Sequence, residues 1–216
     1  MTLCMSGTTE FFTMALFNES EALLGEMNFF TQRIQRIGLS SIELLLESQL
    51  IDVQKIKSVG IDTGPGAFTG LRIALAMAKT IAYSNDCPVF ECSSLDLIRQ
   101  NSANDNVIVA IDGKQKRVYT RIYENGKLSK IMDISPEHLK EITIKNRYEN
   151  FEQLGTGFVN YVELRNRKFN EKSIFHYPFA KNMPLCFNGP YSFDEVSAKY
   201  YRKTQAEEKK DENSGN

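Results

Sequence analysis

Residues 58–92 read SVGIDTGPGAFTGLRIALAMAKTIAYSNDCPVFEC, and this stretch decides the fold of the chain. Its first five residues have the apolar character of a short buried strand, which the glycines and proline at 64–66 end. Residues 67–83 predict a strong helix, and residues 88–92 form the next apolar strand. A strand, a turn, a helix and a second strand predict a βαβ unit with parallel strands and a right-handed crossover.

The flanking sequence extends this unit into an α/β fold with two lobes. Upstream, residues 12–30 predict two strands joined by a turn, and residues 31–50 have helical spacing. Downstream, the polar stretch 101–106 separates the lobes. The strands that follow are predicted at 107–111 and 117–123, with a hairpin turn at Asn125-Gly126 and a short helix at 136–142. We therefore expect a first lobe of residues 1–100, joined by part of 190–205, a second lobe of residues 101–205, and a disordered polar tail at 206–216.

Composition excludes several classes of function. The chain has 216 residues, of which 42% are hydrophobic and 25% charged, so it has enough apolar side chains for a real core. Its formal net charge of -1 argues against a protein that grips RNA alone, so any nucleic-acid role is expected to be shared with a partner. No apolar run long enough for a membrane span and no signal-peptide pattern is found. Four cysteines without a CxxC pair are expected to be reduced thiols of a cytoplasmic protein.

The glycine-rich turn at 64–70 has two interpretations. The free N–H groups at the start of the following helix are suited to an anion, whereas a plain strand-to-helix turn needs only the flexibility of glycine. The spacing G-x-G-x-x-x-G fits neither a P-loop nor a dinucleotide fingerprint.

Small residues recur every four positions along the predicted helix, at Gly70, Ala74, Ala78 and Ala82. They form one narrow stripe, which permits a close approach of another element. That element is either the sheet of the same chain or a helix of another subunit, and both interpretations stay open.

Few residues are suited to catalysis or metal binding. His138 and His176 are far apart and lack metal-ligand spacing, so no metal and no cofactor are expected. Asp62 and Asp112 each follow an apolar strand, where they serve either as catalytic carboxylates or as turn starters. The first strand has no carboxylate until Glu10, which makes a working ATP site hard to build there.

Several segments resemble motifs of the TsaB (YeaZ) family. Residues 64–72, GPGAFTGLR, resemble the family's GPGSFTGLR, and the Ala-rich helix ending at Lys79 follows as it does there. Residues 93–95 are similar to its SSL, residues 112–123 to its DARRGEVY strand pair, and residues 201–207 to its terminal YLRKSxAE. The residues of the motif loop are Gly64, Pro65, Gly66, Phe68, Thr69, Gly70 and Arg72.

The resemblance implies an actin-like (RNase H-like, ASKHA) two-lobed fold with mixed sheets flanked by helices. It also implies a catalytically degenerate subunit that binds TsaD, the transferase of tRNA threonylcarbamoyladenosine modification, with TsaE joining the complex. Helices at 34–50 and 68–83 are expected to contact TsaD, and tryptophan at Ala74 or Ala78 to block the heterodimer without unfolding the monomer. The predicted partner-binding residues are Ile42, Leu45, Leu46, Gly70, Ile73, Ala74, Met77, Ala78 and Ile81.

The chain departs from the family pattern at its start. The opening DTST is replaced by residues 6–9, SGTT, and no histidine precedes His138. These losses argue against an enzyme but leave a scaffold possible, because packing surfaces need shape more than particular acids. Two alternatives remain: a metal-dependent glycoprotease-like or ATP-dependent enzyme of the actin-like superfamily, and a self-associating module with other partners.

Overall fold

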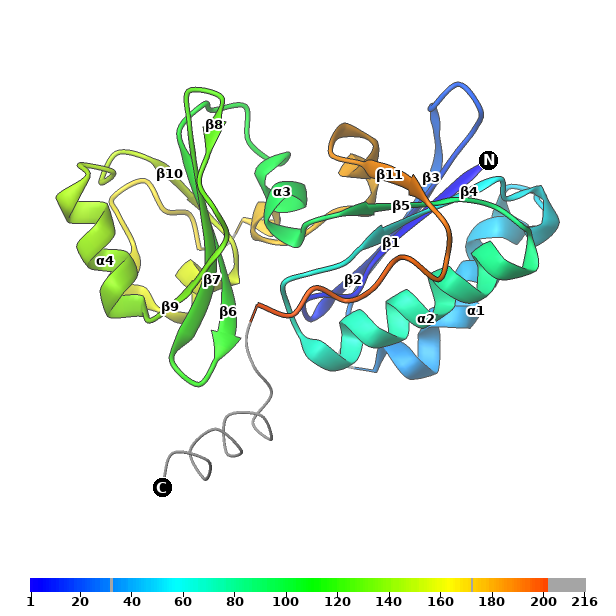
Figure 1. Ribbon diagram of the computed structural model, residues 1–216, viewed down its shortest axis with the longest axis horizontal. Coiled ribbons are helices and arrows are strands. Elements are labelled where there is room, and N and C mark those ends of the chain that lie inside the picture. Colours follow the sequence, from blue (N-terminus) through cyan, green and yellow to red (C-terminus); the bar gives the residue numbers. More distant parts are fainter. Residues whose placement is uncertain (32, 172, 202–216) are drawn as a thin grey trace.

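The computed structural model describes residues 1–31, 33–171 and 173–201, which form two lobes side by side (Figure 1). The first lobe is built on a six-stranded mixed sheet in the order β11-β5-β4-β1-β2-β3. Its strands are β1 (Thr2–Ser6), β2 (Phe11–Phe17), β3 (Leu23–Phe30), β4 (Ser58–Asp62), β5 (Val89–Cys92) and β11 (Asn188–Tyr191).

The predicted βαβ unit is confirmed. Strand β4 pairs in parallel with both β1 and β5, and α2 (Phe68–Ser84) connects β4 to β5. The predicted strand pair upstream is also present, since β2 runs antiparallel to β1 and to β3. Strand β2 is buried along its whole length because both faces of this sheet are covered.

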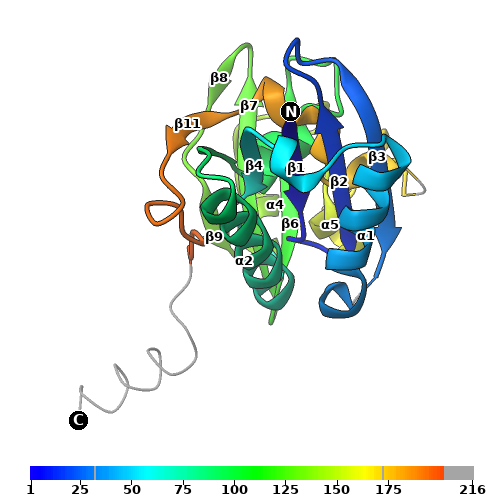
Figure 2. The same cartoon turned by 90° about the vertical axis from the view of Figure 1, so that its right-hand side faces the viewer.

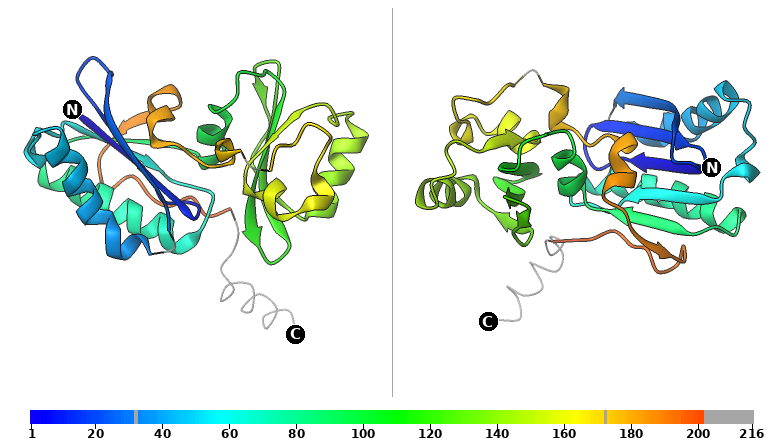
Figure 3. Two further views of the ribbon diagram at one scale, coloured as in Figure 1. Left: turned by 180° about the vertical axis from the view of Figure 1, so that it is seen from behind. Right: turned by 90° about the horizontal axis from the view of Figure 1, so that it is seen from above.

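Two helices cover one face of the first sheet. Helix α1 (Ile34–Ser48) and α2 lie beside each other there, and their buried side chains join those of β1, β2 and β4 in one apolar core (Figure 2). The opposite face is covered by the 3-10 helix η4 (Ala180–Leu185), which contacts β1, β2, β3 and β4 (Figure 3). Among the described helices, none combines the length and the apolar character needed to cross a membrane.

The second lobe has a five-stranded sheet in the order β10-β6-β7-β8, with β9 paired to β7. The predicted hairpin turn at Asn125-Gly126 is confirmed, because both residues have positive φ between β7 and β8. The predicted short helix is also present as α4. The elements of this lobe are β6 (Val107–Lys114), β7 (Arg117–Glu124), β8 (Lys127–Leu128), β9 (Met132–Ile134), α4 (Pro136–Lys145), β10 (Glu152–Leu154), α5 (Thr156–Asn160), η2 (Val162–Leu164) and η3 (Ile174–His176).

Helix α3 (Ser94–Arg99) joins the lobes and packs on both of them. Leu97 belongs to the apolar cluster beneath the first sheet, whereas Leu95 and Ile98 pack against the second sheet. Asp96 accepts two hydrogen bonds of 2.8 Å from the Arg121 guanidinium and one of 2.6 Å from the Tyr123 hydroxyl, both on β7. The short helix is therefore fixed to the second lobe by charge as well as by packing.

The chain returns to the first lobe earlier than predicted. Residues 180–187 pack beneath the first sheet, and Val196 is buried in the core under α1 and α2. The second lobe is accordingly shorter than the expected 101–205, because the return begins near residue 178 and not at 190. Sequence patterns missed this return since its elements are short 3-10 turns and one irregular edge strand. The polar tail predicted at 206–216 lies outside the described residues.

The β6–β7 hairpin has an unfavourable turn sequence. Lys114 pairs with Arg117, so Gln115 and Lys116 form a two-residue loop with φ of 52° and 57°. Such turns favour Asn-Gly, because side chains other than glycine are strained at positive φ.

We expect Lys116→Gly to raise the free energy of unfolding by about 0.5–1 kcal/mol, measured by denaturant titration. Glycine relieves the strain at φ +57° and loses some chain entropy in return. Gly126→Ala, at φ +78° in the next hairpin, is the matched opposite change and should lower stability. An unchanged or lower stability of Lys116→Gly would show that the lysine side chain stabilises this turn.

Candidate functional site

The glycine-rich loop after β4 lies directly on the β1–β2 turn. The Ala67 N–H donates a hydrogen bond of 2.5 Å to the Thr8 carbonyl. A Cβ atom on Gly66 would lie 2.1 Å from the same carbonyl oxygen, and one on Gly70 would lie 2.2 Å from the Gly7 carbonyl oxygen. Glycine is therefore required at both positions, because no side chain fits between the two backbones. The loop therefore has the structural role of a strand-to-helix turn, which was one of the two interpretations from the sequence.

Asp62 is the buried centre of this loop. Its carboxylate accepts hydrogen bonds from the hydroxyls of Ser6, Thr8 and Ser94, each 2.7 Å long, and from the Gly64 N–H at 2.9 Å. Burial raises the pKa of the Asp62 carboxyl, and these four donors oppose that rise. The Asp62 side chain is shielded from solvent. Its hydrogen bonds join β1, β4, the loop and α3, which is the structural role of a turn-starting residue.

Asp112 is also a turn starter, at the end of β6. It accepts hydrogen bonds of 2.8 Å from the Lys114 N–H and ammonium group, and one of 2.7 Å from the Asn160 amide. Burial alone would raise the pKa of the Asp112 carboxyl, but the hydrogen bonds and charge of Lys114, with Asn160, lower it. A carboxylate held ionised in this way is a poor general base.

A cleft of about 700 Å³ separates the loop from the second lobe. Its first-lobe wall includes Thr8, Glu10 and Phe68, and its second-lobe wall includes Asp112 and Gln115. The Arg72 guanidinium lies 3.7 Å from the centre of the Phe68 ring at the mouth of the cleft, and it donates a hydrogen bond to the Tyr200 hydroxyl. Arg72 is thus held by its own chain.

Neither histidine is placed for metal binding. Among residues 1–31, 33–171 and 173–201, no group of three or more His, Cys, Asp or Glu side chains is arranged to hold a metal ion. His138 is exposed on α4 beside Glu141. His176 is buried, accepts a hydrogen bond from the Gly155 N–H at Nδ1, and contacts the Asn170 carbonyl through Nε2 at 2.6 Å.

His176 is expected to make stability depend on pH. Burial lowers its pKa from the usual 6.5. Protonation in the unfolded chain is therefore easier than in the folded one, and the free energy of unfolding should fall as the pH drops below about 6.5. Urea titrations at several pH values between about 5 and 8 measure this change in the free energy of unfolding.

Two variants isolate that effect. His176→Asn keeps an acceptor for the Gly155 N–H without a titrating group, so the fall in stability between pH 6.5 and lower values should shrink. His138→Gln, on the exposed helix α4, should keep the wild-type pH profile. The account of His176 is wrong if the asparagine variant keeps the full pH dependence.

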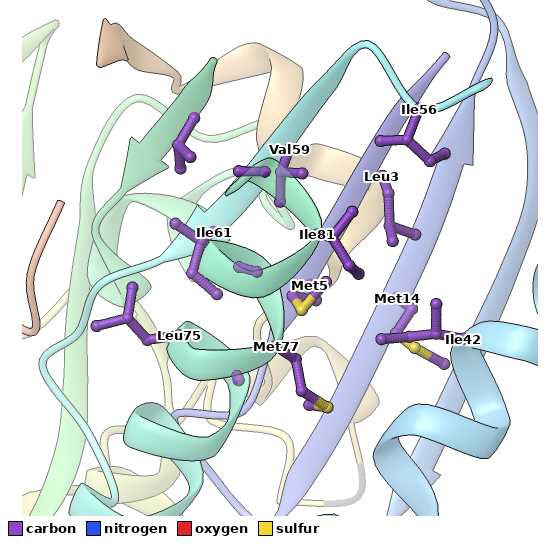
Figure 4. Close-up of a cluster of buried hydrophobic side chains, with 14 of the residues drawn as sticks. Leu3, Met5, Met14, Ile42, Ile56, Val59, Ile61, Leu75, Met77 and Ile81 are labelled. Carbon is purple, nitrogen blue, oxygen red and sulfur yellow. The ribbon is translucent and has the colours of Figure 1, made fainter. Parts of the chain in front are cut away.

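The stripe of small residues packs on the sheet of its own lobe, which corrects the predicted partner-binding set. Ala74 and Ala78 have no exposed surface, and Met77 fills the space over Gly38 of α1. Figure 4 shows Met77 and Ile81 of α2 within the same apolar cluster as residues of the sheet. Buried in this core, and so unavailable to a partner, are Ile42, Leu45, Leu46, Ala74, Met77, Ala78 and Ile81, while Gly70 packs against Gly7 and only Ile73 is half-exposed.

The outward faces of the two helices carry other apolar side chains. Leu39 and Leu44 on α1 are 68% and 53% exposed, and Ala76 of α2 is exposed between the buried positions of that helix. A helix that is apolar nearly all round has apolar residues on both of its faces. Sequence alone therefore could not tell which face the sheet covers.

Comparisons with known proteins agree with this architecture. A family model described as TsaD, tRNA N6-adenosine threonylcarbamoyltransferase, matches residues 32–190. The TsaB protein of Bacillus subtilis is 28% identical over 123 residues, which cover 55% of this chain and 54% of that protein. The TsaB protein of Buchnera aphidicola (strain Sg) is 26% identical over 163 residues, covering 69% of this chain and 76% of that protein. The chain belongs to this TsaD-like family, as a TsaB (YeaZ) member.

Solved structures place the TsaB-family chain in the actin-like fold that was predicted. YeaZ from Pseudomonas aeruginosa matches with a TM-score of 0.68 at 22% identity, over 85% of this chain and 88% of that one. A second protein from that organism, with similarity to peptidase YeaZ, matches with a TM-score of 0.74 at 21% identity, over 93% and 99% of the two chains. At such identities the likeness establishes the shared fold. The chain aligns with only about half the length of the Bacillus subtilis relative.

Proposed function

We propose that this chain is a non-catalytic partner subunit in tRNA threonylcarbamoyladenosine biosynthesis in the cytoplasm. It binds a TsaD-type transferase through the outward faces of α1 and α2. The TsaB relatives carry the name of this pathway, and the matched family model carries that of the transferase. In this proposal TsaE joins the complex and tRNA is contacted only through the partner.

The observation that carries the proposal is the packing of the β1–β2 turn. In an actin-like enzyme, a loop after the first strand has free backbone groups and a carboxylate for a metal-bound nucleotide. Here the Ser6 and Thr8 hydroxyls donate to Asp62, the Thr8 carbonyl accepts from Ala67, and Gly7 is covered by Gly70. The Ser6 and Thr8 hydroxyls, which could otherwise donate to a phosphate, are used to hold the fold together.

The joint between the lobes also favours a scaffold. Enzymes built from two hinged lobes close around their ligand, and this motion requires a connection between the lobes that is easily deformed. Helix α3 is instead buried between both lobes, and Asp96 binds Arg121 and Tyr123 of the second lobe. Such a joint disfavours closure of the two lobes around a ligand.

The surface proposed to contact TsaD consists of the paired outward faces of α1 and α2. Exposed apolar side chains at Leu39, Leu44 and Ala76, with half-exposed Ile73, suit a helix-to-helix contact with a partner. The direct test is co-expression with the TsaD of the same organism, followed by purification through a tag on TsaD. Recovery of both chains in equal amounts supports the proposal, and TsaD recovered alone contradicts it.

An enzymatic function is the second candidate, and the cleft of about 700 Å³ favours it. Its volume is large enough for a nucleotide-sized ligand. Calorimetric titration of the purified chain with ATP and Mg²⁺ distinguishes the two. Binding at micromolar affinity would support an enzyme, whereas the scaffold proposal expects no heat of binding from the chain alone.

Self-association is the third candidate, because the same outward helix faces can pair with a second copy. Light scattering of the chain alone and mixed with TsaD separates this from the scaffold. A homodimer that persists in the presence of TsaD would favour the self-associating module, and its replacement by a heterodimer would favour the scaffold.

A further inference from the structure

Three of the four cysteines meet beneath the sheet of the first lobe. Cys4 on β1 and Cys92 on β5 belong to one apolar cluster on the face that η4 covers, and Cys186 packs against that cluster from the end of η4. All four cysteines are free thiols, and Cys87 belongs to the core on the other side. Sequence spacing did not predict this meeting, because Cys186 is brought in by the returning chain.

The pairing of β11 with β5 places Cys186 beside Cys92. Asn188 of β11 is opposite Glu91 of β5, so the residues just before Asn188 lie next to the residues just after Glu91. Both side chains belong to the apolar packing on the face that η4 covers. Facing positions of neighbouring antiparallel strands bring Cβ atoms about 4.5–5.5 Å apart, which small shifts reduce to the roughly 3.5–4.5 Å of a disulfide.

Cys4 is not a suitable partner for Cys92. Strand β4 lies between β1 and β5, and two interstrand spacings separate their Cα atoms by about 10 Å. Disulfides need Cα atoms within about 7 Å. The Phe187 ring also covers the Cys4 thiol, because both lie 2.7 Å from where a Cβ atom on Gly60 would stand.

We propose that Cys92 and Cys186 form a disulfide when the protein meets hydrogen peroxide. Cys186 is partly exposed and reacts first: its thiolate sulfur attacks one peroxide oxygen, the O–O bond breaks, and a sulfenic acid and one water result. The Cys92 sulfur then loses its proton and attacks the sulfenic sulfur, which releases the second water. Two thiols are oxidised by two electrons in total, and one peroxide is reduced to two waters.

The two cysteines have environments that suit these separate roles. The hydrogen bond with Cys186 and burial raise the pKa of the Cys92 thiol, so Cys92 does not compete for the oxidant. Cys186 ends η4 and has solvent access.

The disulfide would act on the joint between the lobes. The second lobe is inserted between β5 and η4, so the bond would tie the outgoing chain at Cys92 to the returning chain at Cys186. Closing a loop of this size is expected to raise the Tm by roughly 5–10 °C.

The test is oxidation of the purified full chain with hydrogen peroxide, alkylation of free thiols, and mass spectrometry after cleavage at glutamate. Cleavage after Glu91 separates Cys92 from Cys87, which cleavage at lysine and arginine leaves in one peptide. We expect a cross-link between Cys92 and Cys186, two remaining alkylated cysteines and a higher Tm that dithiothreitol reverses.

Matched variants complete the test. Cys186→Ser should abolish both the cross-link and the rise in Tm, while Cys87→Ser should keep both. The proposal is overturned by a cross-link that involves Cys4 or Cys87, by Cys186 ending as a sulfinic acid, by a disulfide between two chains, or by four free thiols after treatment that oxidises Cys186 in the unfolded chain.

Discussion

Asp62→Ala is expected to lower the free energy of unfolding by about 3–5 kcal/mol, a large part of the stability of an ordinary domain. The change removes the acceptor of three hydroxyls and one backbone N–H, all buried with it. These donors join three segments that are distant in the sequence, around residues 6–8, 62–64 and 94, so the loop before α2 should lose its order first. Urea unfolding followed by circular dichroism measures the loss.

Asp62→Asn is the matched control. Its side-chain oxygen still accepts from Gly64, and the hydroxyls of Ser6 and Thr8 can turn to accept from its amide, so less than about half of that loss is expected. Because the folded-state pKa of Asp62 is raised above 3.8, the stability that comes from its protonated form is fully present below that pH and is lost as the pH rises through the raised value. The asparagine variant lacks this slope. Equal losses for both variants would show that the hydrogen bonds contribute little.

Ala78→Trp is expected to lower the free energy of unfolding by more than about 3 kcal/mol, or to prevent folding. Ala78 has no exposed surface and lies where α2 packs on the sheet, so an indole ring has no space there. This reverses the sequence-based expectation that the variant stays folded and blocks a partner. Thermal unfolding of the purified variant measures the effect.

Ala76→Trp, two residues earlier on the same helix, is the control. Its side chain faces solvent, so the stability should change by no more than about 0.5 kcal/mol. A folded Ala78→Trp variant of wild-type stability would contradict the burial of the stripe in the core of its own lobe.

The βαβ unit, the β2–β3 pair and helix α1 of the first lobe were predictable because each is local. Their apolar spacing and the turn at 64–66 depend on neighbours in the sequence. The side that α2 turns to the sheet was not predictable, since Ala74 and Ala78 would look the same under a partner. Periodicity identifies a covered face and leaves the covering element unknown.

The rest of the candidate site depends on contacts that are distant in the sequence. Ser6 and Ser94 reach Asp62 from 56 and 32 positions away, and no spacing rule brings them together. Contacts distant in the sequence also hold the last segment of the described chain in place. The Lys199 N–H donates a hydrogen bond to the Thr63 carbonyl, and the Lys199 ammonium group forms an ion pair with Glu91.

Titration of TsaD with variants of this chain tests the proposed partnership most directly. Leu44→Glu on α1 and Ala76→Trp on α2 change exposed positions of the proposed surface, whereas Ile144→Glu changes an equally exposed apolar residue, 58% exposed on α4. The account predicts that the first two variants fold normally and raise the Kd for TsaD at least about tenfold, while the third binds like the wild type. Wild-type affinity in all three variants, or equal weakening in all three, would contradict it.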